Sequence, residues 1–138
     1  MRIRRPTAAA GLAVLLASTG ILHFVVPGSF DAIVPEQLPG SARTWTHLSG
    51  ATELASAALL AAPRTRRLGA LLAALLFVAV FPANMKMAID WSGRSTWMRA
   101  LAYGRLPLQI PLVLWAVLVY RRGAVRPGRD TGNVSAPL

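Results

Sequence analysis

The residue best suited to chemistry in this sequence is Glu53, because it lies inside an otherwise apolar stretch. An acidic side chain at membrane depth costs about 2.5–3.5 kcal/mol on insertion scales, so we expect it to face a polar interior. Other polar groups lie in or beside further apolar stretches. The candidate binding residues are Glu53, Asn84, Arg105, Gln109, His23 and Ser49. Such a set suits three roles: binding a small polar or quinone-like ligand, proton handling, or a static polar network. In the static network Glu53 pairs with Arg105 and accepts from Asn84, and His23 lies at the rim.

Small and hydroxyl side chains accompany Glu53 at steps of three and four residues. They are Thr46, Ser49, Gly50, Ser56 and Ala57. This spacing predicts one face of a helix. Small residues allow a second helix to approach closely, and hydroxyl groups form hydrogen bonds inside a membrane bundle. We therefore expect this face to point inward.

The sequence gives little support for an enzyme. Ser49 lies one helical turn from Glu53, but no histidine shares their face, so no Ser-His-acid arrangement is visible. The two histidines are not spaced to place two metal ligands on one helix face. There is no phosphate-binding loop and no cysteine, which excludes thiolate metal sites and disulfides. We predict no catalytic residues and no metal site.

Four apolar stretches must position these residues. Hydrophobic residues make up 54% of the chain and charged residues 14%, against about 25% charged in soluble domains. The prediction is an all-α, four-helix transmembrane bundle forming one domain over residues 1–122. The expected helices are 8–26, 44–62, 68–87 and 102–120, followed by a disordered cytoplasmic tail at 123–138.

The basic residues predict the orientation in the bilayer. Ten of the fifteen lysine and arginine residues lie before the first stretch, in the turn 64–67 and in the tail 121–129. The positive-inside rule assigns these three segments to the cytoplasm. We therefore predict a multi-pass protein of the plasma (inner) membrane, with both termini cytoplasmic and the loops 27–43 and 88–104 outside. The basic residues behind the net charge of +10 lie mostly between the apolar stretches, where they orient helices in a bilayer. No nucleic-acid partner is therefore expected.

The loop 27–43 is rich in proline and glycine but also contains apolar residues, namely Phe30, Ile33, Val34 and Leu38. Two interpretations stay open. These residues share one face of a short interfacial helix that covers the bundle, or they belong to an irregular loop with apolar contacts.

Several short motifs occur together in one order along the chain. They are Gly20-Ile21-Leu22-His23-Phe24, Ile33-Val34-Pro35, Leu48-Ser49-Gly50 with Glu53, Pro63-Arg64-Thr65-Arg66, Phe81-Pro82-Ala83-Asn84, and Arg105-Leu106-Pro107-Leu108-Gln109. In this order the chain resembles the DoxX-like membrane proteins over roughly residues 20–122. The resemblance implies a four-helix membrane bundle, motif positions at Glu53, Asn84, Arg105 and Gln109, and a link to redox systems through a quinone or a redox partner protein.

Three functions follow as hypotheses. The first is a membrane accessory or binding component with a polar pocket in the outer half of the bundle. The second is a small-solute or proton transporter, and the third is a membrane scaffold in which the polar network only fixes the geometry. Stripes of small residues, such as Ala51 with Ala55 and Ala70 with Ala74, suit either internal packing or an oligomer interface.

Overall fold

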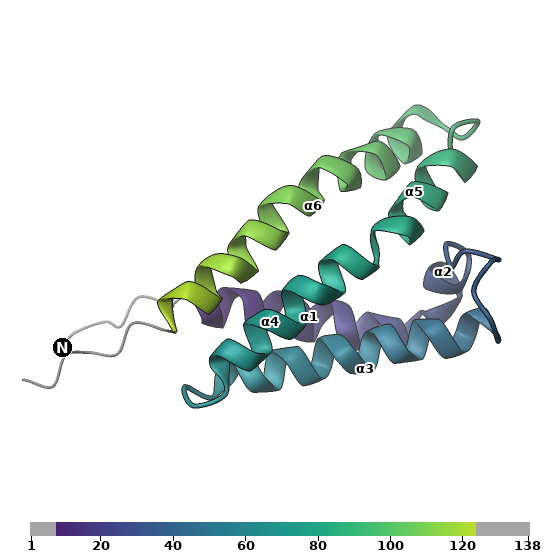
Figure 1. The fold of residues 1–138 in the computed structure, drawn as a ribbon. Helices are drawn as coiled ribbons and strands as arrows, with labels where there is room; N and C mark the ends of the chain where they lie inside the picture. The colour runs from purple at the N-terminus through teal and green to yellow at the C-terminus, as the bar shows by residue number, and fades with distance from the viewer. Residues whose placement is uncertain (1–7, 124–138) are drawn as a thin grey trace, which may run out of the picture.

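The computed structural model describes residues 8–123, and its regular structure is helical throughout that range (Figure 1). The predicted all-α class is confirmed. The helices are α1 (Ala8–Val25), α2 (Pro27–Asp31), α3 (Ala42–Ala61), α4 (Arg66–Ala79), α5 (Phe81–Asp90) and α6 (Thr96–Arg122). The predictions for the tail and for the basic residues before Ala8 fall outside the described residues.

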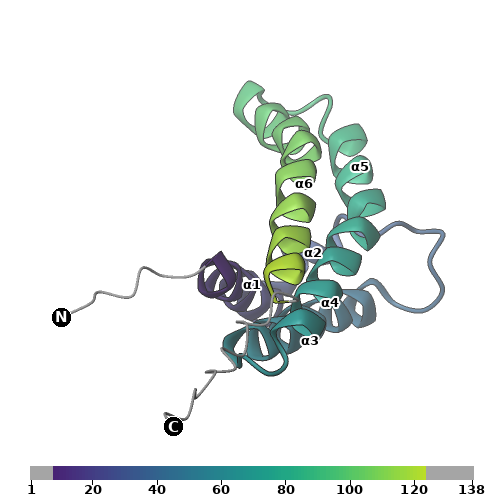
Figure 2. The same ribbon diagram turned by 60° about the vertical axis from the view of Figure 1, so that its left-hand side comes forward.

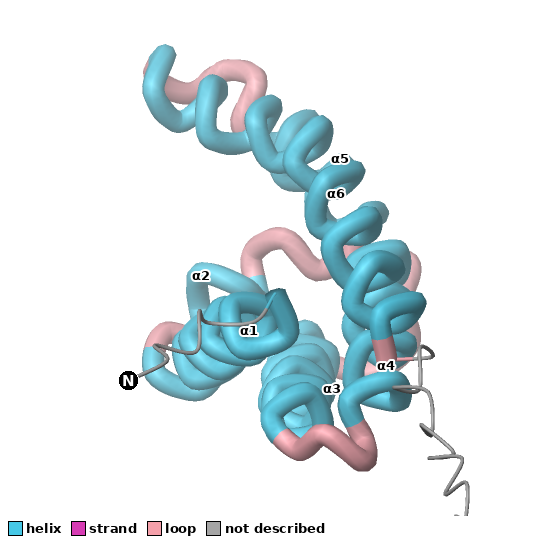
Figure 3. Tube along the Cα trace, turned by 90° about the vertical axis from the view of Figure 1, so that its left-hand side faces the viewer, coloured by secondary structure: helices cyan, strands magenta, loops and turns pink. Residues whose placement is uncertain are grey.

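The helices form two antiparallel pairs. Helices α1 and α3 lie side by side, and the arm made of α4 and α5 runs alongside α6 (Figures 1 and 2). The two pairs meet at the end that holds Ala8, the turn between α3 and α4, and Gly123. We call this the closed end. The pairs diverge toward the other end, the open end, where α2 and the α5–α6 turn lie (Figure 3).

The closed end contains the main apolar core. Its buried side chains come from α1, α3, α4 and α6 and include Leu12, Leu16, Leu60, Phe77 and Val119. Two contacts join the pairs further: the Trp115 indole donates to the carbonyl of Ala8 at 2.9 Å, and the Arg67 guanidinium lies 4.5 Å from the centre of the Tyr120 ring. This core joins the pairs at the closed end. At the open end a smaller buried cluster of Ile33, Met87 and Ala102 links the loop after α2 to α5 and α6.

Local sequence explains where the helices start and break. Helix α3 begins after Ser41, whose hydroxyl accepts from the Thr44 amide at 3.2 Å and so caps the first turn. Helix α4 ends before Val80 and α5 begins at Phe81, with Pro82 in its first turn. Proline has no amide hydrogen and crowds the preceding turn, which favours an interruption at this point.

The helix limits differ from the prediction in the second half of the chain. The third predicted helix, 68–87, is divided into α4 and α5 and continues to Asp90. The fourth begins at Thr96 instead of near 102, and Pro107 and Pro111 lie inside it. Hydropathy marks only the apolar part of a helix, and the first turns of α6 extend beyond that part. The interior prolines are accommodated because a helix in an apolar environment keeps its other backbone hydrogen bonds.

Three segments of the described chain are long and apolar enough to cross a membrane. They are α1, the α4–α5 arm (Arg66–Asp90) and α6. Helix α3 is not among them, because its sequence includes Arg43, Glu53 and several hydroxyl side chains. Large apolar side chains are exposed around the outside of all three segments, for example Val14, Leu71 and Ile110. The fold is therefore compatible with a membrane protein, with three candidate membrane-spanning segments.

Candidate ligand-binding pocket

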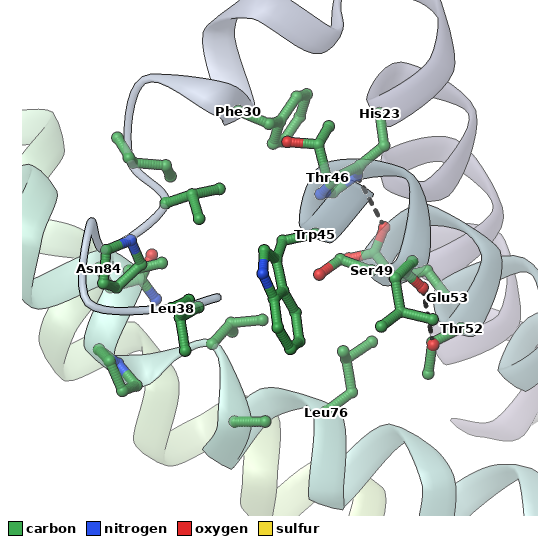
Figure 4. A pocket seen from close by; sticks show the side chains of 18 of the residues that line it. His23, Phe30, Leu38, Trp45, Thr46, Ser49, Thr52, Glu53, Leu76 and Asn84 are labelled. Atoms are coloured by element: carbon green, nitrogen blue, oxygen red, sulfur yellow. Dashed lines mark hydrogen bonds and ion pairs between the residues drawn. The ribbon is translucent and has the colours of Figure 1, made fainter. Parts of the chain in front are cut away.

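A cavity of about 690 Å³ lies between the two helix pairs at the open end. Its walls come from α3, from the α4–α5 arm and from the segment that includes α2 and the following loop, with His23 of α1 and Arg105 of α6. Figure 4 shows Glu53 and Asn84 on opposite sides of this space, with the Trp45 ring between them. Most of the lining is apolar, and the polar groups are gathered on the two opposing walls.

The first polar wall depends on a close approach between α1 and α3. A Cβ atom at Gly20 would lie 3.1 Å from the Gly50 carbonyl oxygen, and one at Gly50 would lie 3.2 Å from the Gly20 carbonyl oxygen. A Cβ atom at Gly50 would also lie 2.6 Å from the Cβ atom of His23, so a side chain does not fit there, and at Gly20 one would be crowded. This is the close helix approach that small residues permit. The predicted inward face of α3 is confirmed: Thr46, Gly50, Ser56 and Ala57 are buried.

This approach brings His23 against Glu53. The Nδ1 atom of His23 lies 3.2 Å from Oε2 of Glu53 and 2.8 Å from the Thr19 carbonyl oxygen. The two side chains are 11% and 13% exposed. The imidazole also stacks on the Phe30 ring, with 3.7 Å between the ring centres. The histidine is therefore held from three sides.

The second polar wall is built at the break between α4 and α5. The Asn84 amide donates to Oε1 of Gln109 at 2.6 Å, and the Gln109 amide donates to the carbonyl of Phe77. In an uninterrupted helix that carbonyl would accept from the amide of Phe81. Gln109 thus replaces a backbone partner at the break and ties α6 to both α4 and α5.

The segment after α2 covers the open end of the cavity. Phe30, Ile33, Val34 and Leu38 all line it, so the segment covers the bundle as the first interpretation expected. Helix is limited to Pro27–Asp31, however, and the residues after it form an irregular loop with apolar contacts, as the second expected. We call residues 30–38 the lid. Its ends are fastened by an ion pair of 2.8 Å between Arg43 and Asp31, and by the Trp45 indole, which donates to the Pro39 carbonyl at 2.7 Å.

The charge of Asp31 is stabilised where it holds the lid. The Thr46 hydroxyl, which is buried, and the Arg43 guanidinium together keep the pKa of Asp31 below its usual value. Asp31 is therefore charged at neutral pH.

The structure places five of the six predicted site residues around one cavity. His23, Ser49, Glu53, Asn84 and Arg105 line it, whereas Gln109 lies behind Asn84 as its hydrogen-bond partner. The expected pairing of Glu53 with Arg105 and Asn84 is wrong in detail. In the described part of the chain, the ion-pair partner of Glu53 is His23, which had been expected only at the rim. Arg105 is near enough to interact with Glu53 electrostatically without a direct ion pair.

Trp45 is a pocket residue that was not among the predicted ones, because tryptophans near the ends of membrane helices usually lie at the lipid surface. Its position four residues before Ser49 was the available signal, since this spacing places both on one side of α3. The expectation that no metal site is present stays a prediction. Over residues 8–123, no group of three or more histidine or acidic side chains is placed to hold a metal ion.

The fold and the cavity define a small all-helical protein with apolar, membrane-compatible helices and a partly polar pocket at one end. The chain belongs to the DUF8561 family, described as a domain of unknown function, which matches residues 12–120. No curated protein and no solved structure matches it. The likeness to DoxX-like proteins accordingly enters the functional argument only as a proposal.

Proposed function

We propose that this protein is a membrane-embedded binding or accessory component that holds a small ligand in the cavity between its helix pairs. The observation that supports this is the composition of the cavity: about 690 Å³ of mostly apolar lining, with a few polar groups on facing walls. Cavities of this size with few polar groups are typical of small-molecule sites. The apolar lining suits the body of a ligand, and His23, Glu53 and Arg105 suit its polar head.

We further propose that α3 crosses the bilayer, giving four spans. Helices α1 and α4 both begin at the closed end, so the chain must return from the open end along α3. The 20 residues of α3 give a length of roughly 30 Å, which matches the hydrocarbon thickness. Its polar face is turned toward the protein, so its outer surface, which includes Leu48, can contact lipid.

The closed end is proposed to face the cytoplasm of the plasma membrane. The described basic residues near it come from the α3–α4 turn and the end of α6: Arg64, Arg66, Arg67, Arg121 and Arg122. The positive-inside rule favours this orientation. The cavity then lies in the outer half of the bundle.

The likeness to DoxX-like proteins adds a redox-linked role to this proposal, either through a bound quinone or through a redox partner protein. A quinone head carries carbonyl oxygens, which accept hydrogen bonds, and its reduced form carries phenolic hydroxyl groups, which donate them. Arg105 and the Ser49 hydroxyl are donors in the lining, and the aromatic rings of Trp45 and Phe30 suit a flat ring. The described residues thus fit such a group, which would supply the electron chemistry when bound.

Native mass spectrometry of the protein purified from its own membrane tests the binding function. Wild type and Glu53→Gln are compared, with Glu36→Gln as the matched control, because Glu36 is exposed in the loop and does not line the main cavity. A small molecule retained by wild type and by Glu36→Gln, but lost from Glu53→Gln, supports the proposal. Identical ligand-free masses in all three variants, with folding intact, contradict it.

A second function, a purely structural polar network, is favoured for one part of the site. Asn84 and Gln109 use their amides on each other and on the Phe77 carbonyl. We therefore assign this pair to the stability of the α4–α5 break, and assign His23, Glu53 and Arg105 to the ligand.

A further inference from the structure

We infer that the ligand of this cavity is a membrane-dissolved amphiphile with a neutral, hydrogen-bond-donating head, such as a long-chain alcohol or a phenol, which enters sideways between α3 and α4. This inference rests on the proposed binding function and specifies the ligand class and its route. Two separate observations carry it: where the cavity lining is exposed, and which hydrogen-bonding capacity the polar wall leaves unused.

The exposed part of the lining faces the direction expected for lipid. Leu48 of α3 is 52% exposed and Leu75 of α4 is 59% exposed, and both line the cavity. Both lie within helices and not in the loops. The gap between these helices therefore has apolar edges at membrane depth, which favours apolar solutes over polar ones.

Three other directions are closed. The lid, residues 30–38, covers the open end and is fastened by the Asp31–Arg43 and Trp45–Pro39 contacts. The opposite end is closed by the core around Phe77 and Leu60. On the α1 side, the Gly20–Gly50 contact leaves no room between α1 and α3. A ligand that comes from the bilayer meets none of these barriers.

The head group is indicated by the Glu53 carboxylate. Its Oε2 atom is buried against Nδ1 of His23 at 3.2 Å and has no exposed surface that a ligand could reach. Glu53 nevertheless lines the cavity, and no described residue donates a hydrogen bond to its other carboxylate oxygen, Oε1. A carboxylate oxygen only accepts hydrogen bonds, so a ligand that supplies a donor would satisfy it.

Arg105 indicates that this donor is neutral. Its guanidinium lines the same cavity and already interacts electrostatically with the Glu53 carboxylate. An ammonium head would place a second positive charge near Arg105. A hydroxyl group donates to the Glu53 carboxylate without that repulsion.

The test uses 11-bromoundecan-1-ol and its methyl ether as quenchers of tryptophan fluorescence in lipid nanodiscs. The difference between wild type and Trp45→Phe isolates the signal of Trp45, which lies in the cavity. We expect the alcohol to bind about tenfold more tightly than the ether, and this preference to be lost in Glu53→Gln, because a hydrogen bond to a charged group is removed. Equal affinity of wild type for the two compounds would overturn the donor assignment.

The route is tested with engineered cysteines, since the chain has none of its own. A cysteine at Leu75 is modified with a bulky thiol reagent in detergent before reconstitution, and Val14→Cys on α1, 66% exposed and outside the cavity lining, is the control. We expect alcohol association to slow at least several-fold for modified Leu75→Cys and to be unchanged for modified Val14→Cys. Unchanged association in both would overturn sideways entry.

The two proposals fail differently. If neither bromo compound quenches Trp45 while native mass spectrometry still shows a Glu53-dependent, water-soluble ligand, the amphiphile inference is wrong and the binding function stands. If no ligand is found by either method in folded protein, the binding function itself is wrong.

Discussion

A Cβ atom at position 50 would lie 2.6 Å from the Cβ atom of His23. Real side chains do not tolerate this separation, so the absence of a side chain at Gly50 is what allows α1 to lie directly against α3. The same contact sets His23 at 3.2 Å from Glu53, one helical turn further along α3. The polar wall of the cavity thus depends on a glycine that has no polar group itself.

Gly50→Ala is therefore expected to separate α1 from α3 and to pull His23 away from Glu53. Overpacking of this kind costs about 1–3 kcal/mol. Thermal unfolding in detergent should show a lower midpoint, and any ligand retained by wild type should bind more weakly. The control is Gly104→Ala on α6, where a Cβ atom meets nothing within 4 Å. That variant should be neutral or slightly more stable. If both variants lower the unfolding midpoint equally, the contact of Gly50 with His23 is not what stabilises the packing of α1 on α3.

The Asn84–Gln109 pair is expected to act as one structural unit. Gln109→Leu removes a donor from the Phe77 carbonyl and an acceptor from the Asn84 amide. Hydrogen bonds between membrane helices average about 0.6 kcal/mol and reach about 1.7, so we expect a loss near the upper value. A double-mutant cycle with Asn84→Leu should give a double variant less destabilised than the sum of the single variants. If the losses in unfolding free energy are strictly additive, the two residues do not interact energetically.

The lid is expected to stay fastened from pH 8 to pH 5 and to loosen only in acid. Because the pKa of Asp31 is lowered by Thr46 and Arg43, the carboxylate keeps its charge through this range. The stabilisation is present above the usual aspartate value of about 4 and is lost as the pH falls through the lower pKa of the folded state. Trp45 emission, taken as the difference between wild type and Trp45→Phe, should change only below about pH 4.

Asp31→Asn is the control for that titration. Its Trp45 signal at pH 7 should already resemble that of wild type in acid, and it should not change with pH. If the Trp45 emission of wild type instead changes near pH 6, a group other than Asp31 is responsible.

Four membrane crossings predict a labelling pattern for single cysteines in the cysteine-free chain. Ser29→Cys and Gly93→Cys should react with a membrane-impermeant thiol reagent added to intact cells, whereas Arg64→Cys should react only after the membrane is opened. All three positions are exposed, so reactivity reports the side of the membrane. If Arg64→Cys and Ser29→Cys react from the same side, α3 does not cross.

Much of this architecture was predictable because membrane helices are encoded locally. Apolar runs gave helices at 8–26 and 44–62, and the structure has them at Ala8–Val25 and Ala42–Ala61. The inward face of α3 followed from its three- and four-residue spacing. Backbone groups at membrane depth must form their hydrogen bonds within their own segment. Composition and the spacing of apolar residues are therefore sufficient to predict where the helices lie.

The partners of the polar residues were not predictable in the same way. Glu53 was expected to meet Arg105, and it lies instead against His23, since the Gly20–Gly50 contact brings α1 closer to it than α6. Gln109 was grouped with the pocket, and it is used on the Phe77 carbonyl left by the break before α5. Both outcomes depend on how closely particular helices approach, which no single segment specifies.

The sequence by itself determined the helical class, the apolar stretches, the polar face of α3 and the set of side chains available for a site. Only the tertiary structure decided that the two helix pairs pack at the closed end and diverge at the other, so that those side chains surround a cavity. The physical reason is that secondary structure and burial follow from local period and composition. Pairing distances are set by contacts such as those of Gly50 with His23 and of Trp115 with Ala8, between residues on different helices.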